Sequence, residues 1–242
     1  MKVAAVIQAR RGSTRLPDKV LADIEGESML ARVIERVALI PGVDAVWVAT
    51  TLAGRDDAVA AEARRCNAYV HRGPELDVLA RYVGAARKAE ADAIVRVTAD
   101  CPLLDPTVSG LVLKRFRDAR AIIGPENVQW VSNVHPTRRY PDGLDTEVVA
   151  REALERAGKE ARSAGDREHV TPWIYKHTPG VGFGLAPAPF NGDLSNLRWT
   201  VDTDDDLALV RAIYRALPKP IPYAMAETLT VYSALAEEAR GA

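Results

Sequence analysis

Short apolar runs alternate with amphipathic segments along the first 120 residues of this 242-residue chain. The apolar runs contain many β-branched side chains, as buried strands do, and lie at 3–7, 45–50 and 93–98, with a shorter run at 69–70. The segments between them repeat apolar side chains every three or four positions, which predicts helices at 28–39, 56–65 and 77–88. Strands alternating with helices predict βαβ units. We therefore expect an α/β fold with a doubly wound, mostly parallel, Rossmann-like sheet.

The alternation breaks down after residue 120. Residues 136–143 predict an irregular crossing, and Pro172 lies within a predicted helix, either near its first turn or at a bend. No linker-like composition divides the chain, so we interpret 1–242 as one domain in which 121–242 elaborate the half formed by 1–120. In the second half we expect strands at 129–134 and 144–149, strand-like segments at 182–186 and 197–201, and helices at 151–161, 166–175, 207–216 and 224–240.

The first predicted strand leads directly into a loop of high positive charge. Residues 8–19 read QARRGSTRLPDK and contain three arginines and one lysine. Gly12 favours a tight turn, and Ser13 and Thr14 add hydroxyl groups. Open α/β sheets bind ligands beyond the carboxyl ends of their strands, and Arg and Lys suit phosphate oxygens. The loop therefore indicates a triphosphate site, although a solvated basic loop would have the same composition.

The common phosphate-binding motifs do not explain this loop. Neither G-x-x-x-x-G-K-[ST] nor G-x-G-x-x-G follows the strand. The loop instead resembles the A-R-x-x-S-x-R-L-P-x-K segment of the CMP-sugar synthetase group, which includes the 3-deoxy-manno-octulosonate and acylneuraminate cytidylyltransferases. The matching residues are Ala9, Arg10, Ser13, Arg15, Leu16, Pro17 and Lys19. This resemblance implies a sheet of the nucleotide-diphospho-sugar transferase type and a loop, with Arg11 and Gly12 included, that binds the phosphates of CTP.

Two aspartates follow predicted strands and should lie at the same edge of the sheet as the loop. Asp100 follows the strand at 93–98, and Asp202 follows the segment at 197–201. One or two carboxylates, completed by phosphates and water, commonly hold Mg²⁺, so this pair suffices for a magnesium site. Both segments resemble the family's T-x-D-x-P-L and V-D-T-x-x-D-L motifs, which supply metal-binding aspartates there. Alternatively, Asp100 could only satisfy the turn before Pro102.

The other acids near these motifs have a structural explanation. Thr203 and Asp206 fit a capping box, and acids at a helix start complement the helix dipole. We therefore assign Asp202 to the metal, while Asp204 could contact the metal's ligands without binding the metal itself. Asp105-Pro106 predicts another helix start, with Asp as the cap and Pro at the first helical position.

Two later segments combine charged, aromatic and hydroxyl side chains. Residues 138–147 (RRYPDGLDTE) and 165–172 (GDREHVTP) resemble Y-P-x-G-L-D-x-E and D-R-E-H-V-T-P of the cytidylyltransferase branch named after the spore-coat polysaccharide protein SpsF. The resemblance implies an acceptor with its own negative charge. Cations would bind its anionic group and carboxylates its hydroxyls, or the carboxylates would only orient the arginines. The expected acceptor-binding residues are Arg138, Arg139, Tyr140, Asp145, Glu147, Arg167 and His169.

The composition limits the class of partner. A net charge of −1 provides no overall field toward nucleic acid or an anionic membrane, so anion binding has to be local. No apolar run has the length of a signal-peptide core or of a membrane span. Cys66 and Cys101 lack metal or redox spacing, as expected in a reducing cytoplasm. We expect a cytoplasmic protein that acts on small molecules, with a homodimer left open.

These features together predict a Mg²⁺-dependent cytidylyltransferase that converts CTP and an acidic sugar into a CMP-sugar and pyrophosphate. Arg10, Arg15 and Lys19 would neutralise the leaving phosphates, while Asp100 and Asp202 would hold the metal. The choice of CTP follows from the resemblance alone.

The base and the acceptor are less sharply defined by the sequence. Thr50, Arg72 and Asp77 lie on predicted loops at the same edge and could read the base. An acceptor that is a small phosphonate or a sugar or polyol phosphate is the nearest alternative. A glycosyltransferase that uses a ready-made nucleotide sugar, or a nucleotide-binding module without catalysis, is more distant.

Overall fold

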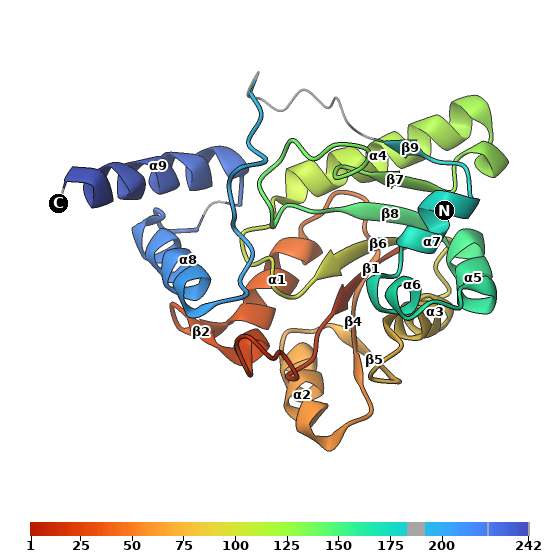
Figure 1. Cartoon of the computed structure of the whole chain (residues 1–242), viewed down its shortest axis with the longest axis horizontal. Coiled ribbons are helices and arrows are strands. Elements are labelled where there is room, and N and C mark those ends of the chain that lie inside the picture. Colours follow the sequence, from red (N-terminus) through yellow and green to blue (C-terminus); the bar gives the residue numbers. More distant parts are fainter. Residues whose placement is uncertain (183–191, 222, 242) are drawn as a thin grey trace.

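The computed structural model describes residues 1–182, 192–221 and 223–241 (Figure 1). Within them a seven-stranded sheet forms the centre, in which β5, β4, β1 and β6 are parallel, β8 is antiparallel to β6 and β7, and β9 is parallel to β7. The expected doubly wound, mostly parallel sheet is confirmed. In sheet order the strands are β5 (Tyr69–Gly73), β4 (Ala45–Thr51), β1 (Val3–Gln8), β6 (Ala93–Thr98), β8 (Glu147–Ala150), β7 (Trp130–Ser132) and β9 (Val181–Gly182).

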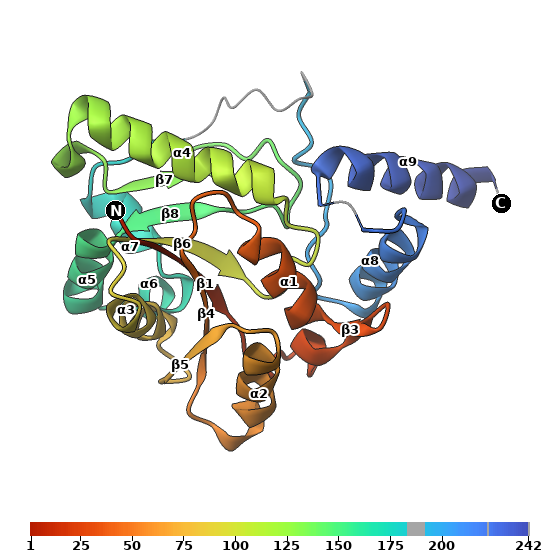
Figure 2. The same ribbon diagram turned by 180° about the vertical axis from the view of Figure 1, so that it is seen from behind.

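Helices cover both faces of this sheet, as the two opposite views show (Figures 1 and 2). A small hairpin of β2 (Asp23–Ile24) and β3 (Glu27–Ser28), which the sequence did not predict, precedes the first helix. None of the helices in the described ranges is long and apolar enough to cross a membrane. They are α1 (Met29–Ala38), α2 (Asp57–Arg65), α3 (Val78–Lys88), α4 (Pro106–Ile123), α5 (Arg151–Glu160), α6 (Ala164–His169), α7 (Pro172–His177), α8 (Asp204–Ala216) and α9 (Met225–Gly241).

The central strand β1 shows why its sequence is apolar throughout. Val3, Ala5 and Ile7 pack into one hydrophobic cluster together with α1, α4 and α8. The alternate residues Ala4 and Val6 pack into a second cluster with α3, α5 and α7. Because successive side chains of a strand point to opposite faces, a strand covered on both faces has to be apolar at every position.

Side-chain caps mark several helix starts, among them the two that the sequence predicted, at Asp105 and at Thr203. Ser28 Oγ accepts a hydrogen bond from the Ala31 amide at 3.0 Å, and the Asp105 carboxylate caps α4 with Pro106 at its first position. The capping box of Thr203 and Asp206 at the start of α8 is also present. Each cap satisfies amide groups that have no partner within their helix.

Two predictions about elements were wrong. The helix expected at 166–175 is two helices, α6 and α7, because Val170 takes a φ of 72° and Pro172 opens the second helix. The segment 197–201 is not a strand of the sheet. Only Val181–Gly182 of the region around 182–186 is described, as β9, and the remainder of that prediction lies outside the described residues.

The segment 197–201 is extended, but it is tied to two loops instead of a strand. The Trp199 amide donates to the Asp142 carbonyl at 2.7 Å, and the Val201 amide donates to the Asp100 carbonyl at 2.8 Å. Gly143 makes this approach possible. It has a φ of +116°, and a Cβ atom there would lie 2.8 Å from the Trp199 carbonyl carbon.

We predict that Gly143→Ala lowers the free energy of unfolding by about 2–4 kcal/mol, because a positive φ costs ~1–2 kcal/mol and the backbone clash adds a similar amount. Gly26→Ala is the matched control, since Gly26 has a φ of +85° and a Cβ atom there would meet no other atom within 4 Å. It should lose only the conformational part, ~1–2 kcal/mol. Urea unfolding measures both, and equal losses would contradict the close approach.

Candidate active site

A cavity of about 400 Å³ lies at the carboxyl edge of the parallel strands. It is bounded by the loop after β1, the end of β6, α3, α6 and the segment before α8. This is where an open α/β sheet binds its ligand. The residues that line it are Gln8, Ala9, Arg10, Gly12, Ser13, Thr14, Arg15, Lys19, Val20, Val78, Arg81, Thr98, Ala99, Asp100, Glu168, His169 and Asp202.

The Lys19 ammonium group joins the two predicted metal-binding aspartates. Its Nζ atom donates to Asp100 Oδ2 at 3.1 Å, to Asp202 Oδ1 at 2.8 Å and to the Val201 carbonyl at 2.6 Å. Lys19 is only 8% exposed. The structure thus brings Asp100 and Asp202 together at one buried positive charge, and each presents one carboxylate oxygen to it.

This arrangement fits a divalent cation. Two oxygens that already surround a buried ammonium group are hard donors of the kind that Mg²⁺ prefers. Burial alone would raise the pKa of Asp202, but hydrogen bonds from Lys19 and Arg198 keep that pKa below its usual value. No cluster of three or more metal-binding side chains occurs in the described part of the chain. Phosphates and water would complete the coordination.

The cationic loop lies beside this pair. Arg15 Nη2 is 2.9 Å from Asp202 Oδ1, although the Arg15 side chain is 64% exposed, and Arg10 lies 3.6 Å from Glu75. The Arg11 amide donates to Asp56 at 2.8 Å and fixes the start of the loop. Two cationic side chains of the loop therefore face the cavity with one weak or exposed contact each.

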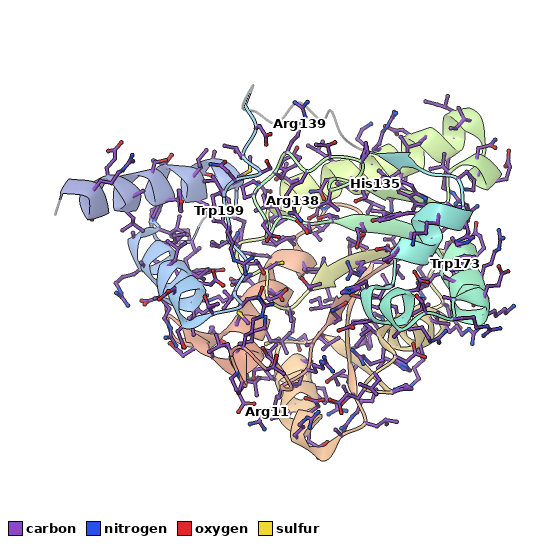
Figure 3. All side chains as sticks on the ribbon, viewed as in Figure 1. Arg11, His135, Arg138, Arg139, Trp173 and Trp199 are labelled. Atoms are coloured by element: carbon purple, nitrogen blue, oxygen red, sulfur yellow. The ribbon has the colours of Figure 1, made fainter. Side chains whose placement is uncertain are left out.

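Two loop residues, Arg11 and Gly12, differ from their predicted roles in phosphate binding and in the tight turn. The Arg11 guanidinium forms a bidentate pair with Asp18 at 2.7 Å and does not line the cavity; Figure 3 shows it beside α2. Gly12 has no positive φ, but a Cβ atom there would lie 3.2 Å from the Arg55 guanidinium. Its small size serves close packing, while the turn itself does not require glycine.

The three residues predicted to read the base lie outside the cavity lining. Thr50 is fully buried, and its hydroxyl finds no partner among the described residues. Arg72 donates to the carbonyls of Thr51 and Ala53 at 2.7 and 2.9 Å. Asp77 caps α3 through the Ala80 amide at 2.8 Å. These contacts give Arg72 and Asp77 a structural role, whereas the Thr50 hydroxyl has none of this kind among the described residues.

The first predicted acceptor segment is largely paired with itself. Arg138 donates to both carboxylate oxygens of Asp145, one of them at 2.7 Å, and lies 3.4 Å from Asp142. Burial raises the pKa of Asp145, against the opposing effect of Arg138. Tyr140 is 3% exposed and packs in the hydrophobic core, whereas Arg139 is exposed at the opposite side of the molecule from Arg11 (Figure 3).

Glu147 belongs to a buried network on β8. It is 4% exposed and pairs with Arg96 on β6. It also accepts hydrogen bonds from Thr171 at 2.8 Å and from Tyr175. Arg96 in turn lies 3.3 Å from Gln8, which lines the cavity. Glu147 is therefore linked to the cavity through Arg96 and Gln8, because it does not line the cavity itself.

The second predicted segment is attached to α3 by an ion pair. Arg167 Nε and Nη2 donate to Asp77 Oδ2 at 2.8 and 2.5 Å, and Arg167 Nη1 donates to the Ala161 carbonyl at 3.0 Å. This contact fixes α6 so that Glu168 and His169 line the cavity. Of the predicted acceptor-binding residues, His169 is therefore the one that the structure places in the cavity wall.

Sequence reasoning missed two arginines at this site. Arg81 is 1% exposed, lines the cavity and donates to the carbonyls of Pro74 and Glu75 at 2.6 and 2.7 Å; burial lowers its pKa. A signal was present, because Arg81 lies three residues after Val78 on the buried face of a predicted helix. Arg198, which contacts Asp202 at 2.7 Å, had no such signal.

A cationic loop opposite paired aspartates, at the carboxyl edge of a parallel sheet, is the arrangement of a nucleotidyltransferase. The comparison with known families agrees. Residues 4–204 match the cytidylyltransferase family, and the chain belongs to this family.

Individual relatives agree with this assignment. The spore coat polysaccharide biosynthesis protein SpsF of Bacillus subtilis is 27% identical over 93% of this chain and 92% of its own. The 3-deoxy-manno-octulosonate cytidylyltransferase of Maricaulis maris is 43% identical over 48% of this chain and 45% of its own. A cytidylyltransferase structure from Leptospira borgpetersenii is 29% identical, with a TM-score of 0.86 over 98% of this chain and 96% of that one.

We predict that Arg15→Ala weakens CTP binding tenfold to a hundredfold and leaves CMP binding nearly unchanged. The reason is that one charge-assisted contact to a leaving phosphate is worth roughly 1.5–3 kcal/mol. Arg11→Ala is the control within the same loop, because its guanidinium is paired with Asp18 outside the cavity. Calorimetry with both nucleotides tests this, and equal losses for CTP and CMP would remove Arg15 from the role.

Proposed function

We propose that this cytidylyltransferase is Mg²⁺-dependent and transfers CMP from CTP to an acidic sugar, releasing pyrophosphate. The observation that carries the proposal is the contact of Lys19 with Asp100 and Asp202 beside the loop that bears Arg10 and Arg15. A phosphate-binding loop and a pair of carboxylates for a divalent cation are the parts that phosphoryl transfer needs.

The reaction requires positioning and charge neutralisation. An acceptor oxygen attacks the α-phosphorus of CTP in line with the departing pyrophosphate. Arg10 and Arg15 neutralise the leaving phosphates, whereas Lys19, which the sequence assigned to the same role, pairs with the two carboxylates. A divalent cation held by Asp100 and Asp202 supplies further neutralisation of phosphate charge when it is bound.

The protein needs no side-chain nucleophile for this chemistry. Cys101 is the thiol nearest the carboxylates, with its Sγ atom 3.7 Å from Asp100 Oδ1. It is 3% exposed, and burial raises the pKa of the Cys101 thiol. A neutral, enclosed thiol is a poor nucleophile, so direct attack by the acceptor fits the site better.

The names of the relatives support the choice of a sugar acid. A 3-deoxy-manno-octulosonate cytidylyltransferase and a polysaccharide biosynthesis protein are both among them. Arg138 is paired with Asp145, and Arg167 is paired with Asp77. The anionic group of the acceptor would therefore bind to other cations. His169 is in the cavity wall, whereas Arg139 is exposed and lies outside the cavity lining.

We predict that Asp100→Asn and Asp202→Asn each abolish turnover while the protein remains folded. The amide oxygen still accepts a hydrogen bond from Lys19, but a neutral amide binds Mg²⁺ poorly. EDTA should inactivate the parent enzyme in the same way. Asp204→Asn, at an exposed acid two residues from Asp202, is the control and should stay active. Pyrophosphate release measures turnover, and circular dichroism measures folding. An active Asp202→Asn enzyme would overturn the metal assignment.

The acceptor is tested by a pyrophosphate-release screen with CTP, Mg²⁺ and a panel of ulosonates, aldonates, sugar phosphates and small phosphonates. We expect turnover with a sugar acid. Turnover with phosphonates and none with any sugar acid would refute the sugar acceptor but leave the cytidylyltransferase activity supported.

Once an acceptor is found, we predict that His169→Gln raises its KM without changing the affinity for CTP, whereas Arg139→Ala, outside the cavity lining, changes neither. His177→Gln is the matched control, since His177 contacts the Trp173 carbonyl at 2.7 Å and lies outside the cavity lining. Weakened CTP binding with normal acceptor kinetics in the His169→Gln enzyme would place His169 on the nucleotide side of the site.

A further inference from the structure

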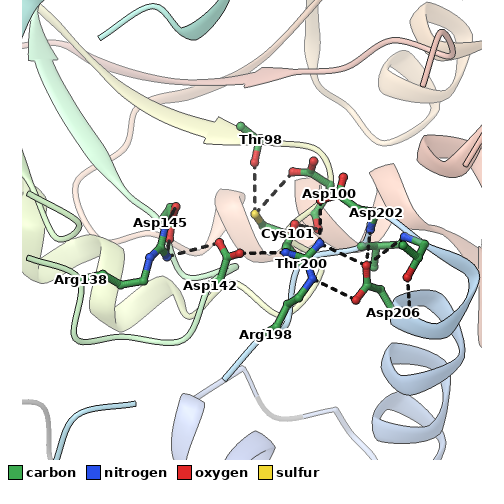
Figure 4. Close-up of polar contacts among 12 residues, drawn as sticks. Thr98, Asp100, Cys101, Arg138, Asp142, Asp145, Arg198, Thr200, Asp202 and Asp206 are labelled. Atoms are coloured by element: carbon green, nitrogen blue, oxygen red, sulfur yellow. Dashed lines mark hydrogen bonds and ion pairs between the residues drawn. The ribbon is translucent and has the colours of Figure 1, made fainter. Parts of the chain in front are cut away.

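Arg198 lies at the centre of a chain of charged contacts that runs from Arg138 to Asp202 (Figure 4). Its guanidinium contacts three carboxylates: Nη1 meets Asp142 Oδ2 at 3.1 Å, Nη2 meets Asp202 Oδ2 at 2.7 Å, and Nε meets Asp206 Oδ1 at 3.1 Å. Asp206 is itself fixed, because its Oδ2 atom accepts from the amides of Asp202 and Thr203 at 2.8 and 2.9 Å.

The two oxygens of Asp202 therefore have separate partners. Oδ1 receives Lys19 and Arg15 at 2.8 and 2.9 Å on the cavity side. Oδ2 accepts a hydrogen bond from Arg198 alone among the described residues. The Arg198 side chain is 43% exposed, but its guanidinium also contacts Asp142 and Asp206, so leaving Oδ2 would break one of three contacts that share a single planar geometry.

The two carboxylate oxygens of Asp100 also have separate partners. Its Oδ2 atom faces Lys19 at 3.1 Å, while its Oδ1 atom lies 3.7 Å from the Cys101 thiol, which can donate to it. Each aspartate thus offers one oxygen to the position where both meet Lys19. The thiol contact is long and weak, so Arg198 is the stronger of the two restraints.

The number of oxygens per carboxylate matters for the choice of cation. Mg²⁺ requires a compact octahedron and few protein ligands, whereas Ca²⁺ accepts six to eight oxygens and readily takes both oxygens of one carboxylate. A site in which each carboxylate is limited to one oxygen therefore favours the smaller cation.

We propose that Arg198 is a specificity-determining positioning residue: by occupying Asp202 Oδ2, it limits Asp202 to one-oxygen binding and so disfavours Ca²⁺ relative to Mg²⁺. Asp142 supports it by fixing Nη1. This inference rests on the proposed function, because it assumes that Asp100 and Asp202 hold the divalent cation.

The test is the ratio of Ca²⁺ to Mg²⁺ affinity, measured by displacement of Mn²⁺ in the presence of CTP and without acceptor. Arg198→Met should increase this ratio by roughly tenfold or more, the scale on which partners of metal ligands act. Loss of a positive charge would strengthen the binding of both cations alike, so the ratio separates a change in geometry from a change in charge. Asp142→Asn should shift the ratio in the same direction by less.

Two controls make the result decisive. Arg156→Met removes an arginine that pairs with Glu160 at 3.1 Å on α5 and should leave the ratio unchanged. An unchanged ratio in both Arg198→Met and Asp142→Asn would overturn the proposal, and the Asp142→Asn protein keeps the test available if Arg198→Met does not fold. Turnover of the parent enzyme with Mg²⁺ is assayed separately. Absence of that turnover would refute the proposed function, whereas an active parent with an unchanged ratio would refute only the role of Arg198.

Discussion

The buried ammonium group of Lys19 is the contact on which the rest of the site depends. It joins Asp100, which is 81 residues away in the chain, and Asp202, which is 183 residues away. A charge with so little exposure is costly unless it is paired and hydrogen-bonded, so the fold has to bring both carboxylates and the Val201 carbonyl to one point. The cationic loop, the end of β6 and the segment before α8 are thereby held in fixed relation.

The arginines of the second half mostly brace the walls of the site. Arg138 is paired with Asp145, Arg167 with Asp77, and Arg96 with Glu147. Such pairs remove charge from the ligand-binding surface, but they fix the loops that carry Asp142 and His169, because breaking one would leave a partly buried charge without its partner. The arginines that face the cavity, Arg10, Arg15 and Arg81, come from the first half. They thus come from a different part of the chain than Arg138 and Arg167, which brace its walls.

Local patterns were sufficient for most of the first half, though not for the β2–β3 hairpin, and they placed Asp100 and Asp202 at one edge of the sheet. Apolar runs and capping residues predicted β1, β4, β6 and their helices. A strand buried on both faces is apolar at every position, and unpaired helix amides favour a capping side chain. Asp202 was placed at the correct edge even though 197–201 is not a strand. The reason is that the Val201 amide still pairs with the Asp100 carbonyl, so the two aspartates are neighbours through a loop contact.

The sequence by itself determined the sheet, the cationic loop and the two carboxylates that face it, because these depend on periodicity and on residue type. Only the tertiary structure decided which charges are free. The sequence shows Arg11, Arg138 and Arg167 as available cations, yet each meets a carboxylate in the fold. It likewise gives no sign that Arg198 bridges three aspartates. Whether a charge binds a ligand or a neighbour depends on distances of a few ångströms between residues far apart in the chain, and these distances are set by packing.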